Sequence, residues 1–357
     1  MGFPPNFQYR STLDWLLSSI RVNNGAGSSA YFRIFKGWTK PYPETTGYII
    51  CTLLDYYDLL AEEELMESAL SCSKWLLKIQ NNDGSFPAEL GGKGKPIVFD
   101  TSMCLFGLTD IYRKTSDQTF LNALQETVSW ILKQYHYEKR WNKYTFIQGF
   151  EPTYYTMVIW AMLYANMFVK HESIEREMAL ALNNYARLIN DNSSVQYWAF
   201  KAKDQAFTHT IAYTWQGFLE SAILLNDQKI IEKCIKTGYQ LVNLFRKNGV
   251  FAGSYDENWN GNYSFRCLTG DAQISLFLSR LSCLTNEKAF QQLAYGLFAN
   301  LEKYPAKLPL AGFSGGIAGS YPVWGSYERL SYPNWAAKFY LDACLMQINL
   351  KKKSAEY

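Results

Sequence analysis

Hydrophobic residues along this chain follow two alternating patterns. The first is amphipathic, as in residues 62–80, where Leu65, Cys72 and Leu76 fall on one stripe and charged residues lie between them. The second is apolar on nearly every side, as in residues 49–60 and 157–169. A helix with one apolar stripe covers a core, whereas a helix that is apolar all round lies inside it. The two patterns therefore predict outer and inner helices in alternation.

The outer pattern recurs at a nearly constant distance. Its aromatic or leucine positions, Trp15, Trp75, Trp130, Tyr185, Leu241 and Leu297, are 60, 55, 55, 56 and 56 residues apart. Between them, residues that can cap a helix, mostly Thr, Ser, Asp or Asn, open each inner segment. Six such repeats predict an all-α (α/α)6 toroid of six helical hairpins, with one domain over residues 7–350 and a polar C-terminal tail over 351–357. An open solenoid of the same hairpins is the alternative.

The connections that lead from outer to inner helices are long, and they all leave the same end of the predicted toroid. They span residues 23–43, 81–99, 135–150, 191–207, 248–267 and 304–331, and they are rich in Gly, Trp and Tyr. Long loops on one end of a rigid scaffold are where binding residues usually lie. The N-termini of the inner helices converge on this end, and their partial positive charge suits a hydroxyl-rich or anionic ligand. We therefore expect a ligand site at this mouth.

Composition narrows the possible function classes. Aromatic residues make up 17% of the 357 residues, and the net charge is only +3, without the basic stripe that nucleic-acid binding requires. The seven cysteines form no CxxC pair and lie mostly within apolar helical segments, as is usual in a reducing compartment. No signal peptide pattern and no membrane-spanning apolar stretch is present. We expect a cytoplasmic protein with no nucleic-acid partner.

Sequence motifs for common cofactors are absent. The chain has no Gly-x-x-x-x-Gly-Lys-Ser/Thr phosphate loop, no Gly-x-Gly-x-x-Gly after a strand and no His-Glu-x-x-His zinc motif. His209, Cys267 and Asp271 lack the spacing of a metal site. We therefore expect neither a cofactor nor a resident metal.

Candidate acid–base residues gather at the predicted mouth. His209 opens the fourth inner helix and Tyr213 follows one turn later, while Tyr255 lies in the fifth long loop. A histidine in such a position can give or take a proton near neutral pH. Carboxylates at the mouth are Glu44, Asp100, Glu151, Asp256 and Asp271. Glycoside hydrolysis needs two carboxylates, and Glu44 and Asp256 are our candidate catalytic members, although each carboxylate also fits a helix cap or first-turn acid.

Candidate substrate-binding residues lie in the same loops. Trp259 can stack on a pyranose ring, and Arg266 or Asn334 can neutralise a sugar carboxylate. Asp100 and Asp271 can accept hydrogen bonds from sugar hydroxyls. Residues 315–325 contain four glycines, which allow close backbone approach to a ligand, together with Tyr321 and Trp324.

Two groups of motifs carry resemblances to known families. Residues 80–86, Gln-Asn-Asn-Asp-Gly-Ser-Phe, resemble the glutamine-to-aromatic repeat of the terpenoid cyclase and prenyltransferase superfamily. That resemblance implies the toroid but not isoprenoid chemistry, because the chain has no Asp-x-Asp-Asp motif. Residues 42–49, 209–214, 267–273 and 332–339 are similar to a bacterial toroid family often encoded among polysaccharide biosynthesis genes. This resemblance implies a role in making or trimming a surface glycan. A more distant resemblance covers toroid polysaccharide lyases, sugar epimerases and unsaturated-uronide hydrolases.

These observations leave several hypotheses for the function. The first is a lyase or epimerase that removes a proton from an acidic, uronate-containing glycan, with His209, Tyr255 or Tyr213 as the base. The second is a glycoside hydrolase that uses two mouth carboxylates. The third is a scaffold that binds a glycan or a lipid without catalysis, and isoprenoid chemistry is the fourth. The expected partner is an oligosaccharide or polysaccharide, either free or lipid-linked.

Overall fold

Helices of two kinds alternate along the chain in the computed structural model, which describes residues 9–307 and 312–355. The outer helices are α1 (Arg10–Arg21), α3 (Glu63–Ile79), α5 (Gln118–Glu138), α7 (Ile174–Ala186), α9 (Gln228–Asn248) and α11 (Lys288–Leu301). The inner helices are α2 (Pro43–Leu60), α4 (Val98–Thr115), α6 (Thr156–Val169), α8 (Thr208–Leu225), α10 (Leu268–Thr285) and α12 (Asn334–Ala355). This arrangement confirms the predicted (α/α)6 toroid.

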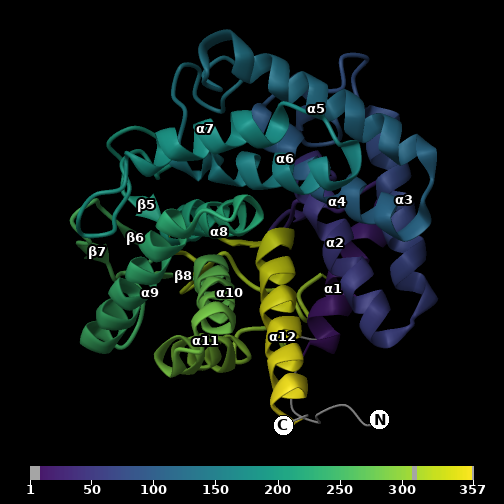
Figure 1. Ribbon diagram of the computed structural model, residues 1–357. Helices are drawn as coiled ribbons and strands as arrows, with labels where there is room; N and C mark the ends of the chain where they lie inside the picture. Colours follow the sequence, from purple (N-terminus) through teal and green to yellow (C-terminus); the bar gives the residue numbers. More distant parts are fainter. Residues whose placement is uncertain (1–8, 308–311, 356–357) are drawn as a thin grey trace.

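The ring is closed by contacts between the two ends of the chain. Helix α12 packs against α1 and α2, and Figure 1 shows the yellow α12 beside these purple helices. Strand β1 (Tyr31–Arg33) pairs with β2 (Gly37–Trp38) and, on its other edge, with β10 (Ser331–Pro333) near the end of the chain. Both contacts join the first hairpin to the last, so the open solenoid alternative is wrong.

The long loops are held by short strands that the sequence patterns did not predict. Strands β3 (Pro87–Glu89) and β4 (Lys93–Pro96) form a hairpin, while β6 (Ser254–Tyr255) pairs with both β5 (Ala206–Phe207) and β7 (Gly261–Asn262). Strand β8 (Arg266–Cys267) pairs with β9 (Ser320–Tyr321). A short 3-10 helix, η1 (Thr153–Tyr155), leads directly into α6. Several of these pairings join one loop to its neighbour, and they fix the wall of the mouth.

The end of the described chain differs from the predicted tail. Helix α12 continues to Ala355, so residues 351–355 are its last turns rather than a separate tail. The remaining predicted tail residues, 356 and 357, and the predicted domain start at residues 7 and 8 lie outside the described residues.

Helices α2 and α4 approach each other closely because glycines face each other at their contact. A Cβ atom built at Gly47 would lie 2.6 Å from the carbonyl oxygen of Met103, and one at Gly107 would lie 2.2 Å from the carbonyl oxygen of Gly47. Both neighbours are backbone atoms, so only movement of a whole helix could make room. The contact holds the N-terminal halves of these two helices side by side.

Replacing Gly107 by Ala is therefore expected to destabilise the protein by about 1–3 kcal/mol, the usual cost of overfilling a packed core. Urea unfolding measures this change. Gly296→Ala in α11 is the matched control, because no atom lies within 4 Å of the added methyl group. Since Ala is the better helix former, the control should gain about 0.5–1 kcal/mol. A loss of similar size in both variants would contradict the close-contact explanation.

Candidate functional site

A cavity of about 670 Å³ opens where the N-termini of the inner helices converge. Helices α2, α4, α8 and α12, the 3-10 helix η1 and five of the six long loops contribute to its lining. The lining residues are Tyr31, Tyr42, Glu44, Tyr48, Ile97, Phe99, Asp100, Phe146, Tyr154, Tyr155, Phe200, Lys201, Asp204, Phe207, His209, Tyr213, Ser326, Tyr327, Glu328, Arg329 and Trp335. We call this the mouth cavity. Its position agrees with the ligand site expected from the loops.

Aromatic rings form most of the wall of the mouth cavity. The ring of Phe99 lies 5.0 Å from that of Tyr154, 5.8 Å from that of Tyr155 and 5.6 Å from that of Tyr213. Tyr31 packs edge-on against Trp335 at 4.9 Å. Rings with a polar edge suit a ligand that has both apolar faces and hydroxyl groups.

Two carboxyl groups, Glu44 and Asp100, lie together on one side of the mouth cavity. Pro43 begins α2 and so places Glu44 in its first turn, and Asp100 occupies the first turn of the neighbouring α4. The phenol of Tyr42 donates a hydrogen bond of 2.6 Å to Oδ2 of Asp100. Asp100 is 5% exposed, while Glu44 keeps part of its surface open to the cavity. We call Glu44 and Asp100 the acid pair.

Burial controls the protonation of the acid pair. It raises the pKa of Asp100 to about 7. It also raises the pKa of Glu44 well above its usual range, and the nearby charge of Asp100 adds to that effect. Two like charges in one desolvated place disfavour each other, so the pair retains a proton near neutral pH. A carboxyl group that titrates near the working pH can both give and take a proton.

His209 lies on α8 in the same cavity and is held by a chain of two glutamines. Its Nδ1 is 2.6 Å from Oε1 of Gln273, whose Nε2 donates to Oε1 of Gln216 at 3.1 Å. This leaves Nε2 as the ring nitrogen available to a ligand. Burial lowers the pKa of His209 to about 4, against the opposing effect of its hydrogen bond with Gln273, so the ring is neutral at pH 7.

Tyr213 lies next to His209 at the floor of the cavity, with its ring 4.3 Å from the imidazole. Its hydroxyl is 3.5 Å from that of Tyr48 on α2. Burial raises the pKa of both tyrosines well above the usual value, so both remain protonated at neutral pH. Tyr213 is therefore better placed to donate a hydrogen bond than to act as the base considered from the sequence.

Charged side chains at the rim were not found from the sequence. Lys201, Asp204 and Arg329 are exposed and line the outer part of the cavity, next to Glu328. Glu328 accepts a hydrogen bond of 3.3 Å from the hydroxyl of Tyr31. These residues lie in loops without a repeated pattern, which is why no sequence signal marked them.

Three predicted residues of the fifth loop lie away from the mouth cavity and hold the loop together. The hydroxyl of Tyr255 accepts a hydrogen bond of 2.8 Å from the amide of Ala252 and is buried. Asp256 accepts from the backbone amides of Asn258 and Asn260 at 2.8 and 2.9 Å. Trp259 donates to the carbonyl of Asn192 at 3.0 Å. None of the three lines the cavity, which corrects the expectation that they meet the substrate there.

Two residues expected to neutralise a sugar carboxylate have protein partners instead. Arg266 forms a buried ion pair with Asp271, and Asn334 donates to the hydroxyls of Ser28 and Thr45, both at 2.9 Å. These contacts occupy the groups that a ligand would use, and neither Arg266, Asp271 nor Asn334 lines the mouth cavity.

The remaining predicted binding residues, Tyr321 and Trp324, are exposed on the last loop. The ring of Tyr321 packs 5.0 Å from that of Tyr304, outside the cavity. Of the predicted site, the structure thus brings Glu44, Asp100, His209 and Tyr213 together and leaves the others apart.

The described residues were also compared with the patterns of metal sites and of membrane-spanning helices. In residues 9–307 and 312–355, no three His, Cys, Asp or Glu side chains are grouped in a way that could hold a metal ion. None of the described helices combines the length and apolarity needed to cross a membrane.

Comparison with known proteins identifies the fold class. Neither a family model nor a curated protein matches the sequence. Among solved structures, a sugar epimerase from a ruminal bacterium superposes with a TM-score of 0.77 at 12% identity, covering 95% of this chain and 96% of that one. An unsaturated glucuronyl hydrolase specific for heparin gives 0.73 at 16% identity, covering 96% and 97%. The cellobiose 2-epimerase of Bacillus thermoamylovorans gives 0.73 at 13% identity, covering 96% and 98%. At these identities the likeness establishes the (α/α)6 toroid fold.

Proposed function

We propose that this protein is a carbohydrate-active enzyme that hydrolyses a bond in an oligosaccharide, with the acid pair Glu44–Asp100 giving and taking the proton. The observation that carries the proposal is the position of this pair, joined to Tyr42, in an aromatic cavity large enough for sugar rings. Hydrolysis of a glycosidic bond needs an acid for the leaving oxygen and a base for water. A carboxyl pair that shares one proton near pH 7 contains one protonated group, which can act as the acid, and one carboxylate, which can act as the base.

The protonation of the other candidates supports the acid pair over His209 and the tyrosines. A base acts best when the pKa of its conjugate acid is near the working pH. The pKa of His209 is about 4, so it is a weak base at pH 7, whereas the pKa of Asp100 is about 7. Buried Tyr213 keeps its proton. In this proposal His209 accepts and Tyr213 donates hydrogen bonds that orient the sugar.

We further propose that the substrate is an acidic, uronate-containing oligosaccharide. Lys201 and Arg329 are exposed at the rim, where they can meet a sugar carboxylate as it enters. The structural neighbours named as unsaturated glucuronyl hydrolases support this substrate class. The motifs of this chain resemble those of a family encoded among polysaccharide biosynthesis genes. On that basis we propose that the substrate is part of a surface glycan or of its precursor.

Proton abstraction without hydrolysis, as in an epimerase or a lyase, is the second proposal. The free Nε2 of His209 and the acid pair both belong to the cavity lining, and epimerisation needs a base and an acid close to one carbon. Structural neighbours named as sugar epimerases support it. Here the proton leaves carbon rather than water, so the two proposals predict different products.

Incubation with acidic and neutral oligosaccharides in heavy water, followed by mass spectrometry, separates these reactions. Cleavage products that contain added water support hydrolysis. Deuterium at carbon in an uncleaved sugar supports an epimerase, and a newly unsaturated fragment supports a lyase. Asp100→Asn should abolish whichever product forms. If glycans raise the melting temperature but no sugar changes, the enzyme proposal is overturned in favour of a binding scaffold.

A further inference from the structure

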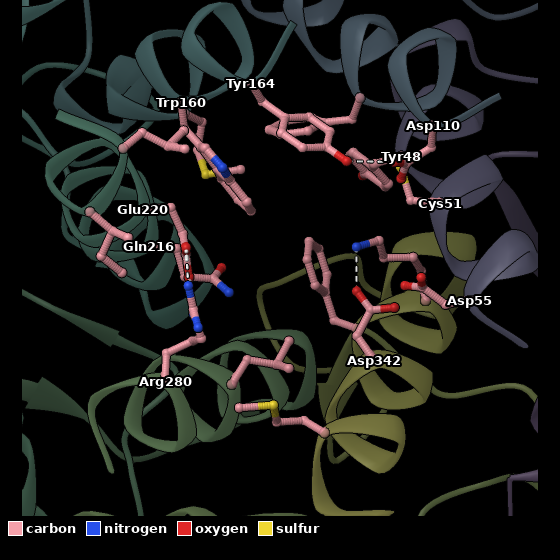
Figure 2. A pocket seen from close by; sticks show the side chains of 18 of the residues that line it. Tyr48, Cys51, Asp55, Asp110, Trp160, Tyr164, Gln216, Glu220, Arg280 and Asp342 are labelled. Carbon is pink, nitrogen blue, oxygen red and sulfur yellow. Dashed lines mark hydrogen bonds and ion pairs between the residues drawn. The ribbon is translucent and has the colours of Figure 1, made fainter. Parts of the chain in front are cut away.

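A second cavity of about 550 Å³ lies farther along the same six inner helices, toward their C-terminal ends. Its lining comes from α2, α4, α6, α8, α10 and α12, so it is centred on the axis of the toroid (Figure 2). Tyr48 lines both this cavity and the mouth cavity, which places the two on either side of one floor. We call it the lower cavity. A volume in this range holds a small organic molecule.

The wall of the lower cavity is mainly apolar. Trp160 and Phe106 pack edge-to-face at 4.7 Å on one side, and Figure 2 shows Trp160 and Tyr164 together along one wall. Phe339, Met157, Met346 and leucine and isoleucine side chains form much of the rest. A hydrophilic sugar would leave many hydroxyl groups unpaired against such a surface. The lining thus favours a ligand with an apolar body.

Most charged groups of the lower cavity are already paired. Arg280 binds both carboxylate oxygens of Glu220, at 2.7 and 2.9 Å. Lys338 pairs with Asp342, which also accepts a hydrogen bond of 2.7 Å from Thr52.

Asp110 is satisfied in the same way. Its Oδ1 accepts 2.6 Å from the phenol of Tyr164 and 3.1 Å from Arg113. Each cation of the lining, Arg280 and Lys338, thus already has an ion-pair partner.

Asp55 is the remaining carboxylate of the lining. Within the part of the chain that the structure describes, no hydrogen bond or ion pair to its side chain is found, and the side chain is open to the cavity. Figure 2 shows Asp55 and Asp342 facing Glu220, Gln216 and Arg280 across the opening. Burial, together with the charges of Asp342 and Asp110, raises the pKa of Asp55 to about 7, against the opposing charges of Lys338 and Arg113. Both of these cations are paired with other carboxylates, so Asp55 has no ion-pair partner of its own among the described residues.

We propose that the lower cavity binds an organic ammonium compound, with its cation at Asp55 and its apolar body against Trp160, Phe106 and Phe339. The ammonium group neutralises the unpaired carboxylate, while the aromatic wall packs against the apolar body. The apolar body replaces water on the methionine, leucine and isoleucine surface. An anionic ligand is disfavoured, because Arg280 and Lys338 are both engaged and four carboxylates line the cavity.

Isothermal titration calorimetry with matched probes tests this site. The probes are phenethylammonium and hexylammonium chloride, each compared with the neutral alcohol of the same shape, 2-phenylethanol and 1-hexanol. We expect each ammonium compound to bind at least about tenfold more tightly than its alcohol, because only the ammonium group can form a charged hydrogen bond with the carboxylate of Asp55. Asp55→Asn should remove that preference.

Two further variants complete the test. Asp58→Asn is the matched control, because Asp58 lies one turn along the same helix, outside the cavity, and pairs with Lys114; it should bind the ammonium probes as the native protein does. Trp160→Leu should weaken the binding of the ammonium compounds and the alcohols alike, because the apolar body that they share packs against this ring. No binding of either ammonium probe up to about 10 mM, or equal binding of amine and alcohol, would overturn the proposal. So would an unchanged preference in Asp55→Asn.

Discussion

Replacing Asp100 by Asn is expected to lower kcat for the oligosaccharide by about 10³-fold, within the range found when a general acid or base is removed. Asn has nearly the same size and can still accept the hydrogen bond from Tyr42, so the shape of the mouth cavity should be kept. It cannot hold the proton that the acid pair shares. KM should change little, because the loss concerns the reacting proton rather than the aromatic wall. Steady-state kinetics on the substrate found in the heavy-water experiment measures both constants.

The control for this variant is Asp256→Asn, which makes the same chemical change at a mouth loop outside the cavity. Its kcat should stay close to the native value. A loss of kcat smaller than about tenfold in Asp100→Asn is less than the removal of a general acid or base usually causes. That result would mean that the acid pair does not carry the proton. Equal losses in both variants would indicate that loop order, and not proton transfer, limits the rate.

Stability should change in the opposite direction from activity in Asp100→Asn. The folded pKa of Asp100 is about 7, whereas an unfolded Asp titrates near 3.9. Between these values the folded state binds more protons than the unfolded state, so native stability falls as pH rises from about 4 to about 7. Asn does not titrate. The variant should therefore gain stability relative to the native protein over this interval, which urea unfolding at a series of pH values can measure. A constant difference would show that the pKa of Asp100 is not raised.

The part of the site that the sequence predicted belongs to the inner helices. Glu44, Asp100 and His209 each follow the opening of an inner helix, and repeated helices in a toroid bring such openings to one place. The sixfold spacing thus predicted the fold and also predicted that these side chains lie at the same end of the toroid. Their protonation could not be predicted in the same way, because burial is a property of the packed cavity.

The loop residues of the site could not be predicted, because strand pairing between separate loops decides where they point. Arg266 pairs across β8 and β9 with Tyr321, which is 55 residues away in the sequence. Nothing in either segment alone shows that Arg266 turns toward Asp271 rather than toward a ligand. Arg329 and Lys201, at the rim, were missed because their loops have no repeated sequence pattern.

The lower cavity was missed because its helices were interpreted as apolar on all sides. Asp55 and Asp110 lie at the same position relative to the starts of α2 and α4, and Asp342 lies in the first half of α12. Charged residues are rarely buried unless they are paired. Carboxylates at matching places in α2 and α4, together with Asp342 in α12, were therefore a usable signal for a cavity with charged groups on the axis.

Replacing Arg266 by Met is expected to destabilise the protein by about 3–5 kcal/mol, the usual cost of leaving one member of a buried ion pair alone. Asp271 is 1% exposed, and Arg266 Nε donates to its Oδ2 at 3.1 Å. The other carboxylate oxygen, Oδ1, has no hydrogen-bond partner among the described residues, so nothing else is present to compensate the charge. Arg266 also donates to the hydroxyl of Tyr304 at 2.9 Å, which ties the loop before α10 to the last loop. Urea unfolding at pH 7 measures the loss.

Two comparisons separate the buried charge from other effects of Arg266→Met. Arg21→Met removes a pair with Glu64 in which both side chains are about half exposed, 50% and 47%, and it should cost less than about 1 kcal/mol. The double variant Arg266→Met with Asp271→Asn should regain most of the lost stability, because no unpaired charge remains buried. Failure of the second change to restore stability would mean that the packing of Arg266 on Tyr304, rather than the neutralisation of Asp271, is what Arg266 contributes. Restored stability would show that the residue expected to hold a sugar carboxylate instead neutralises a carboxylate of the protein itself.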